Sequence, residues 1–130
     1  MTDAETRAEL VRHWSDPADQ EQIHEIYHDD VVLEFPQSGE RLLGLANVRG
    51  MREAYPAKLT FTIQRMRNSG DLWVSELVLT YDGDAPVHAV NIMEFRDGKV
   101  THETIFFGDP WVPPAWRAPW VEVPEPAPGA

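Results

Sequence analysis

The hydrophobic pattern of the chain changes once, at Pro56, and this change constrains the fold more than any other feature. Before Pro56 the apolar residues recur every three or four positions, as on one face of a helix. After Pro56 they alternate with polar residues, as in strands with one buried face. Helices followed by an antiparallel meander indicate an α+β domain.

Three helices are predicted before Pro56. The first opens with a capping box at residues 2–5 and runs to about Trp14. The second begins at Asp16-Pro17, an N-cap followed by a proline in the first turn, and continues through Tyr27. The third covers about residues 45–55 and ends before the proline, which pushes the preceding residue out of the helical region. Their predicted buried faces contain Leu10, Val11 and Trp14, then Ile23, Ile26 and Tyr27, then Val48, Met51, Arg52 and Tyr55.

Six strands are predicted, two before Pro56 and four after it. The first two cover residues 31–35 and 41–43 and are joined by the turn at residues 36–39. The meander follows in residues 59–66, 72–81, 87–95 and 100–107. Asp97-Gly98 is the clearest of its hairpin signals, because these residues tolerate the left-handed angles of a tight turn.

Charge and composition exclude several kinds of partner and chemistry. The formal net charge is -11 and the few Lys and Arg residues are scattered, which argues against nucleic acid and anionic membranes as partners. The chain has no cysteine, so disulfides, thiolate catalysis and cysteine-bound metals are excluded. No long apolar run or signal peptide is present, and we expect a cytoplasmic location.

Residues 111–130 differ from the rest in being rich in proline and tryptophan. Prolines oppose regular structure, whereas three exposed tryptophans would be costly to leave in water. We expect residues 111–120 to form an ordered strap packed on the domain or on a partner subunit. Residues 121–130 are expected to be a frayed tail.

Several segments resemble the nuclear-transport-factor-2-like superfamily, which includes SnoaL-like polyketide cyclases and ketosteroid isomerase. Residues 26–36 (IYHDDVVLEFP) resemble the family's entry to its first strand. Gly44 stands before the third helix, as in the family. Residues 90–100 (VNIMEFRDGKV) resemble the penultimate hairpin of the isomerase and cyclases.

The resemblance implies a cone-shaped, curved antiparallel sheet wrapped around the N-terminal helices, over residues 1–110. The cone would enclose a pocket for a small, largely apolar organic molecule, with no cofactor. The resemblance also implies a homodimer formed through the outer face of the meander, which offers Val78, Val90 and Ile92. The fold itself does not specify a reaction, because it carries isomerases, cyclases, epoxide hydrolases, dehydratases and modules without activity.

The catalytic pattern of ketosteroid isomerase is only partly matched. The position of its carboxylate base is Phe35 here, and phenylalanine cannot abstract a proton. The position of its protonated aspartic acid is Asn91, whose amide could donate a hydrogen bond to a ligand carbonyl or simply bond to its neighbours. No aspartate lies in the middle of a meander strand, so the acidic pattern of the epoxide hydrolases is not apparent.

Glu103 is the candidate group for proton transfer. Alternation along the last strand puts Glu103 and Ile105 on one face and His102 on the other. In the related isomerase the face that matches Glu103 lines the cavity, which implies that Glu103 stands near Asn91 inside the pocket. A register shifted by one residue would instead place Glu103 in water and His102 inside.

The predicted pocket is largely aromatic, although most such residues in a small domain belong to the ordinary core. Its lining residues are predicted to be Trp14, Tyr27, Phe35, Tyr55, Phe61, Trp73, Met93, Ile105 and Phe107. His24 and His28 are one helical turn apart, but nothing supplies a third ligand, so no metal site is predicted.

Three functions remain open from the sequence. The first is an acid–base enzyme, an isomerase, cyclase or dehydratase, with Glu103 transferring the proton and Asn91 orienting the substrate. The second is a ligand-binding or dimerisation module without catalysis. The third is a structural domain whose cavity is filled by its own side chains.

Overall fold

A computed structural model describes residues 1–15 and 20–124 of the chain; the predicted helix start at Asp16-Pro17 lies outside them. The helices are α1 (Asp3–Ser15), α2 (Gln20–His24) and α3 (Leu45–Ala54). The strands are β1 (Tyr27–Phe35), β2 (Glu40–Leu43), β3 (Leu59–Ser69), β4 (Leu72–Tyr81), β5 (Val87–Arg96) and β6 (Lys99–Gly108). A short 3-10 helix, η1 (Ala115–Trp120), follows. The predicted α+β class is confirmed.

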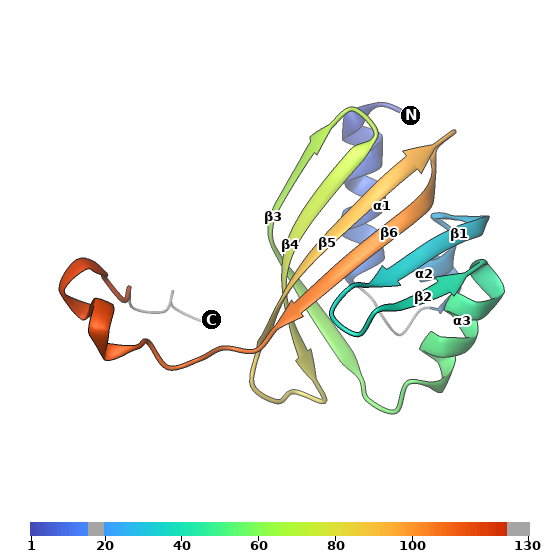
Figure 1. Cartoon of the computed structure of the whole chain (residues 1–130). Helices are drawn as coiled ribbons and strands as arrows, with labels where there is room; N and C mark the ends of the chain where they lie inside the picture. Colours follow the sequence, from blue (N-terminus) through green and yellow to red (C-terminus); the bar gives the residue numbers. More distant parts are fainter. Residues whose placement is uncertain (16–19, 125–130) are drawn as a thin grey trace.

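The strands form one curved, open sheet in the order β2-β1-β6-β5-β4-β3. In Figure 1, α1 and α2 lie behind the sheet, and α3 lies beside its β2 edge. All neighbouring strands are antiparallel except β1 and β6, which run parallel. The predicted turn at Asp97-Gly98 is present, with positive φ at both residues (52° and 79°). Curvature of the sheet toward the helices gives the predicted cone-like shape.

The start of β1 corrects the sequence prediction, which continued the second helix through Tyr27 and began the strand at Val31. The helix ends at His24 and Tyr27 already belongs to the strand. The backbone N–H of Val100 donates to the carbonyl of Ile26 (2.7 Å), and Tyr27 pairs with Val100. These partners come from β6, about seventy residues later in the chain, so local periodicity could not reveal them.

Helix α1 packs against β3 through one face. The predicted cap is present, since the N–H of Glu5 donates to the Thr2 hydroxyl (3.1 Å). Leu10 and Trp14 are buried as predicted, but Val11 is 46% exposed and His13 is buried instead. A helix turns about 100° per residue, so a buried stripe through Thr6, Leu10 and Trp14 is centred on Leu10 and includes position 13 before position 11.

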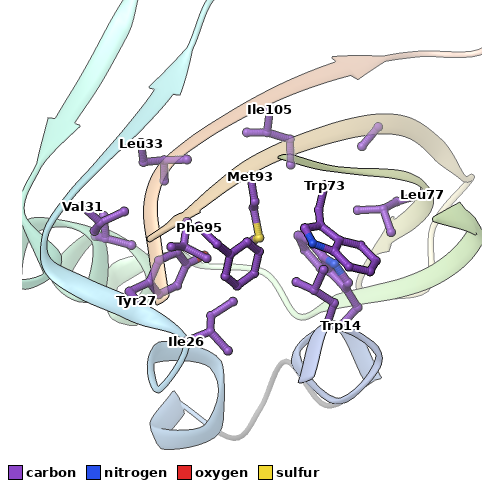
Figure 2. Close-up of a cluster of buried hydrophobic side chains, with 14 of the residues drawn as sticks. Trp14, Ile26, Tyr27, Val31, Leu33, Trp73, Leu77, Met93, Phe95 and Ile105 are labelled. Carbon is purple, nitrogen blue, oxygen red and sulfur yellow. The ribbon is translucent and has the colours of Figure 1, made fainter. Parts of the chain in front are cut away.

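The core lies between the inner face of the sheet and the helices. Figure 2 shows Trp73, Met93 and Phe95 pointing from the sheet toward α1 and α2, where they approach Trp14 and Ile26. Burial of such large apolar side chains stabilises the fold by roughly 1.5–3 kcal/mol each. The core holds α1 against the sheet beside the cavity described below.

The imidazole of His13 is part of this core. Its ring makes edge contacts with Trp14 (4.6 Å between centroids) and Tyr27 (5.8 Å). Burial, with the nearby charge of Arg52, lowers the pKa of His13 from 6.5 to about 3. The folded protein therefore holds this side chain neutral.

We expected the segment after β6 to pack either on the domain or on a partner subunit. The structure shows that it does not pack on the domain. It leads away from the sheet and ends in η1 (Figure 1). Trp111, Trp116 and Trp120 are each more than 70% exposed. Prolines at positions 110, 113 and 114 fix φ and favour an extended backbone in this segment.

The pKa of His13 predicts a loss of stability in mild acid. The unfolded chain takes up a proton near pH 6.5, whereas the folded chain takes it up only near pH 3. Folding free energy is therefore lost as the pH falls through this window, by about 1.4 kcal/mol per pH unit and about 2 kcal/mol between pH 7 and 5. Urea unfolding at both pH values measures it.

The variant His13→Gln isolates this contribution. It should be less stable than the wild type at pH 7, because packing is lost, but its stability should fall less between pH 7 and 5. His88→Gln, at an exposed position on β5, is the matched control and should keep the wild-type dependence. An equal fall in His13→Gln and wild type would show that His13 is not held neutral.

Candidate functional site

A cavity of about 730 Å³ lies between the inner face of the sheet and helices α1 and α3. Its wall is mainly aromatic and aliphatic, and its charged groups include the buried Glu103 and the partly buried Arg52. Among the predicted pocket residues, those at the cavity wall are Trp14, Phe35, Tyr55, Phe61, Ile105 and Phe107. A space of this size accommodates a small organic molecule.

The other predicted pocket residues lie behind the cavity wall. Tyr27, Trp73 and Met93 are almost fully buried in the core (Figure 2). Asn91 is also buried, at 1% exposure, and does not contribute to the cavity wall. These side chains therefore belong to the buried interior of the domain and not to the cavity wall.

The register of β6 turns Glu103 inward. Glu103 pairs with Met93 on β5 and Leu33 on β1, both of which face the core. The side chain of Glu103 is 1% exposed. His102 points to the opposite face, where Nδ1 lies 2.7 Å from a carboxylate oxygen of Glu94. Of the two registers open from the sequence, the structure has the one with Glu103 inside.

Both carboxylate oxygens of Glu103 accept hydrogen bonds. The hydroxyl of Tyr27 donates to Oε1 (2.5 Å), and the amide of Asn91 donates to Oε2 (2.6 Å). A guanidinium nitrogen of Arg52 lies 3.7 Å from Oε1. A charge taken out of water needs such compensation, because a buried ion without partners costs several kcal/mol. These contacts fix the position and rotamer of the carboxylate.

Arg52 completes the polar cluster and was not identified as a site residue from the sequence. Its guanidinium donates to the Tyr27 hydroxyl (3.0 Å) and lies over the Tyr27 ring, 5.2 Å from the centroid. A signal for it exists in the sequence, since Arg52 falls on the apolar stripe of α3 with Val48 and Met51. A charged residue on a buried helix face calls for a buried partner.

Tyr27 remains a hydrogen-bond donor to Glu103 because its proton is hard to remove. Burial raises the pKa of Tyr27 well above its usual value of 10, although the charge of Arg52 acts in the opposite direction. The phenol therefore stays neutral, accepting a hydrogen bond from Arg52 and donating one to Glu103. Tyr27 thus links the helix α3 to the carboxylate on β6.

His13 and Trp14 contribute polar atoms close to the cavity. Within the described part of the chain, the Nδ1 atom of His13 and the Nε1 atom of Trp14 are buried and have no hydrogen-bond partner. Both residues belong to the cavity wall. His13 was not selected from the sequence, because the predicted buried face of the first helix contained Leu10, Val11 and Trp14.

The arrangement can accept a proton at a fixed position in an apolar cavity. Glu103 is the carboxylate at the wall, and Phe35 occupies the β1 position where the isomerase has its base. Residues 1–15 and 20–124 contain no group of three side chains suited to hold a metal ion. None of the helices in this part of the chain is long and apolar enough to cross a membrane.

Comparison with solved structures supports the fold over most of the length of the chain. An NTF-2-like protein of unknown function from Burkholderia xenovorans LB400 is 42% identical, with a TM-score of 0.85 over 94% of this chain and 97% of that chain. A candidate ketosteroid isomerase from Kribbella flavida DSM 17836 is 28% identical, with a TM-score of 0.83 over 96% and 93%. The second protein is thus similar in sequence as well as fold.

A more distant structure shares the fold alone. A hypothetical protein with a ketosteroid-isomerase-like fold from Catenulispora acidiphila DSM 44928 is 16% identical, with a TM-score of 0.67 over 82% of this chain and 88% of that chain. That structure is a complex with trimethylamine. A search of curated proteins finds no match.

The family profile described as a SnoaL-like domain matches residues 7–103, which is more than half of the sequence. The match confirms the resemblance found in residues 26–36 and 90–100. It covers α1 to the middle of β6, including Tyr27, Arg52, Asn91 and Glu103. The chain therefore belongs to the SnoaL-like domain family.

Proposed function

We propose that residues 1–110 form a domain that binds a small, largely apolar organic molecule in the cavity, with Glu103 as the group that transfers a proton. The observation that carries the proposal is the carboxylate of Glu103, held by two hydrogen bonds at the wall of an apolar cavity. Isomerisation, cyclisation and dehydration all require a positioned base and a dry cavity. A ligand with a carbonyl group and an acidic C–H fits this chemistry.

Tyr27, Asn91 and Arg52 have supporting roles in the proposal. Asn91 donates its hydrogen bond to Glu103, so it positions the base instead of the substrate. Tyr27 holds the other carboxylate oxygen, and Arg52 balances the buried charge. Because Arg52 also belongs to the cavity wall, its guanidinium is the group placed to stabilise negative charge that develops on a ligand oxygen.

The proposed base is on β6, whereas ketosteroid isomerase has its carboxylate at the position of Phe35 on β1. β1 and β6 are neighbours in the sheet, and Leu33 pairs with Glu103. A carboxylate moved to the adjacent strand faces the same cavity from a different angle. We therefore infer the class of reaction and substrate from the residues of this chain and not from those of ketosteroid isomerase.

The alternative function is a ligand-binding or dimerisation module without catalysis. One observation favours the dimer: the outer face of the meander carries apolar side chains, with Val90 38% and Phe106 40% exposed. The helices contact β1, β2 and β3, and none covers this face within the described residues. We propose that two copies of the chain associate through it, with or without a reaction in the cavity.

Proton transfer can be tested without knowing the natural reaction. A base that removes a proton next to a carbonyl catalyses exchange of that hydrogen for deuterium in D2O. We expect the protein to accelerate this exchange in a panel of cyclic ketones, followed by proton NMR. Glu103→Gln should reduce the rate by about a hundredfold or more, the usual contribution of a positioned base.

The matched control is Glu94→Gln, on the outer face of the neighbouring strand, which should retain the wild-type rate. Circular dichroism and the melting temperature check that Glu103→Gln remains folded. Exchange that proceeds equally fast in Glu103→Gln and wild type would overturn the assignment of the base. No acceleration by any ketone that binds would favour the module without catalysis.

Ligand binding is tested separately by filling the cavity. Met51 lies at the cavity wall on α3, so Met51→Trp should occupy part of the space and weaken ketone binding by about tenfold or more, equal to about 1.4 kcal/mol. Titration calorimetry with the tightest ketone of the panel measures it. Val11→Trp, at an exposed position on α1, should bind as the wild type does. Undiminished binding to Met51→Trp would place the ligand elsewhere.

A further inference from the structure

Two polar atoms at the C-terminal end of α1 have no role in the proton transfer proposed above. His13 and Trp14 are only 3% and 4% exposed, and both belong to the cavity wall. Within residues 1–15 and 20–124, Nδ1 of His13 and Nε1 of Trp14 are buried without a hydrogen-bond partner. Buried polar side-chain atoms in native proteins are nearly always hydrogen-bonded, so each exception needs an explanation. At the wall of a cavity, a bound ligand can supply the partner.

The hydrogen bonding of His13 shows which of its nitrogens is the acceptor. Burial lowers the pKa of His13 to about 3, so the imidazole is neutral, with one protonated nitrogen and one acceptor nitrogen. The backbone carbonyl of Ile23 is hydrogen-bonded to this ring, and a carbonyl can only accept. Because Nδ1 has no partner, the nitrogen that donates to Ile23 is Nε2. Nδ1 is therefore unprotonated and requires a donor.

The indole of Trp14 has the opposite requirement. Its Nε1–H group can only donate, so it requires an acceptor. Trp14 projects from α1 toward the inner face of the sheet (Figure 2), and packing against Phe61 (4.8 Å between centroids) fixes its ring. The rings of His13 and Trp14 lie edge to face, 4.6 Å apart. One oxygen atom can bridge two nitrogens up to about 6 Å apart, so a single ligand group can contact both rings.

Charge and hydrogen-bonding capacity select the ligand group. An ammonium group donates hydrogen bonds, but the positive charge of Arg52 acts at His13 and disfavours a second cation there. A carbonyl or carboxylate accepts from Trp14 but cannot donate to Nδ1 of His13. A hydroxyl group is neutral and both donates and accepts. It satisfies both side chains.

We infer that the ligand of the cavity carries a hydroxyl group, which donates a hydrogen bond to Nδ1 of His13 and accepts one from Nε1 of Trp14. The inference rests on the ligand binding proposed above, but not on proton transfer by Glu103. It narrows the proposed ligands from ketones to hydroxy ketones. His13 and Trp14 are then residues that determine specificity and take no part in proton transfer.

Tyr27 relates this hydroxyl-binding position to the proposed base. The Tyr27 ring contacts the His13 ring (5.8 Å between centroids), and its hydroxyl donates to Glu103 (2.5 Å). The hydroxyl-binding position and the carboxylate are thus separated by about the length of one tyrosine side chain. A ligand that reaches both has its hydroxyl and its carbonyl at different ends of a rigid skeleton. A bicyclic ketone with one hydroxyl is therefore a suitable probe.

Tetralone, a bicyclic ketone, and its hydroxylated derivatives test the inference. Titration calorimetry compares tetralone with three hydroxytetralones whose phenol group is remote from the carbonyl. We expect at least one hydroxytetralone to bind about tenfold or more tightly than tetralone, because a site built for a hydroxyl discriminates against the analogue that lacks it. The corresponding methoxytetralone should show no such gain, since a methoxy group cannot donate a hydrogen bond.

Two variants assign the gain to the two nitrogens. His13→Phe and Trp14→Phe retain an aromatic ring but remove the polar atom. In each variant the affinity ratio of hydroxytetralone to tetralone should fall by about fivefold or more. Trp73→Phe, a buried position away from the cavity wall, is the matched control and should keep the wild-type ratio. A ratio is used because general loosening of the fold affects both ketones.

Nuclear magnetic resonance of nitrogen-15-labelled histidine tests the protonation of His13 without any variant of the cavity wall. Long-range proton–nitrogen correlations distinguish the two tautomers, and the spectrum of His13→Gln identifies the His13 signals. We expect the proton on Nε2. The Nδ1 signal should shift upfield when hydroxytetralone binds, as an acceptor nitrogen does, and should shift less with tetralone. A proton on Nδ1 would overturn the inference.

The binding data separate this inference from the proposed function. Equal affinities for tetralone and all hydroxytetralones, with both weakened by Met51→Trp, would overturn the inference and leave ligand binding in the cavity intact. A wild-type affinity ratio in His13→Phe would place the hydroxyl elsewhere and also overturn it. Absence of binding by every tetralone, or binding that Met51→Trp leaves undiminished, would contradict both proposals. Deuterium exchange reports on Glu103 independently of these results.

Discussion

The buried carboxylate of Glu103 imposes the strictest condition on the structure. Two hydrogen bonds and one guanidinium surround it, and they come from β1, β5 and α3. Each of these elements must be in place for the charge to be compensated, and removal of one partner from a buried ion pair costs about 3–5 kcal/mol. The network therefore links a helix to three strands that are far apart in sequence.

The cavity exists because the curved sheet and the helices leave a space that the side chains do not fill. Trp14 packs against Phe61 at its wall, with ring centroids 4.8 Å apart, and α3 brings Arg52 to the other side. Natural cores are close-packed, so an apolar space of this size beside a fixed carboxylate is unusual for a purely structural domain. This is the physical reason for favouring a ligand over a filled interior.

The two faces of the sheet have different roles. The inner face provides the core and the cavity, and the outer face carries partly exposed side chains such as Val90 and Phe106. Alternation of side chains along each strand allows both to be built from the same ten residues, as His102 and Glu103 show on β6.

The sequence determined the first and third helices, the meander, its turns and the family, because these depend on spacing between near neighbours. The strands at residues 59–107 agree with the structure to within three residues at each end, and the Asp97-Gly98 turn has the expected backbone angles. The tertiary structure decided the rest. The parallel pairing of β1 with β6 places Tyr27 in β1 and turns Glu103 inward. The packing of α3 places Arg52 beside the carboxylate of Glu103. Local periodicity cannot specify which of two faces is buried, since that depends on contacts between residues as far apart as positions 27 and 103.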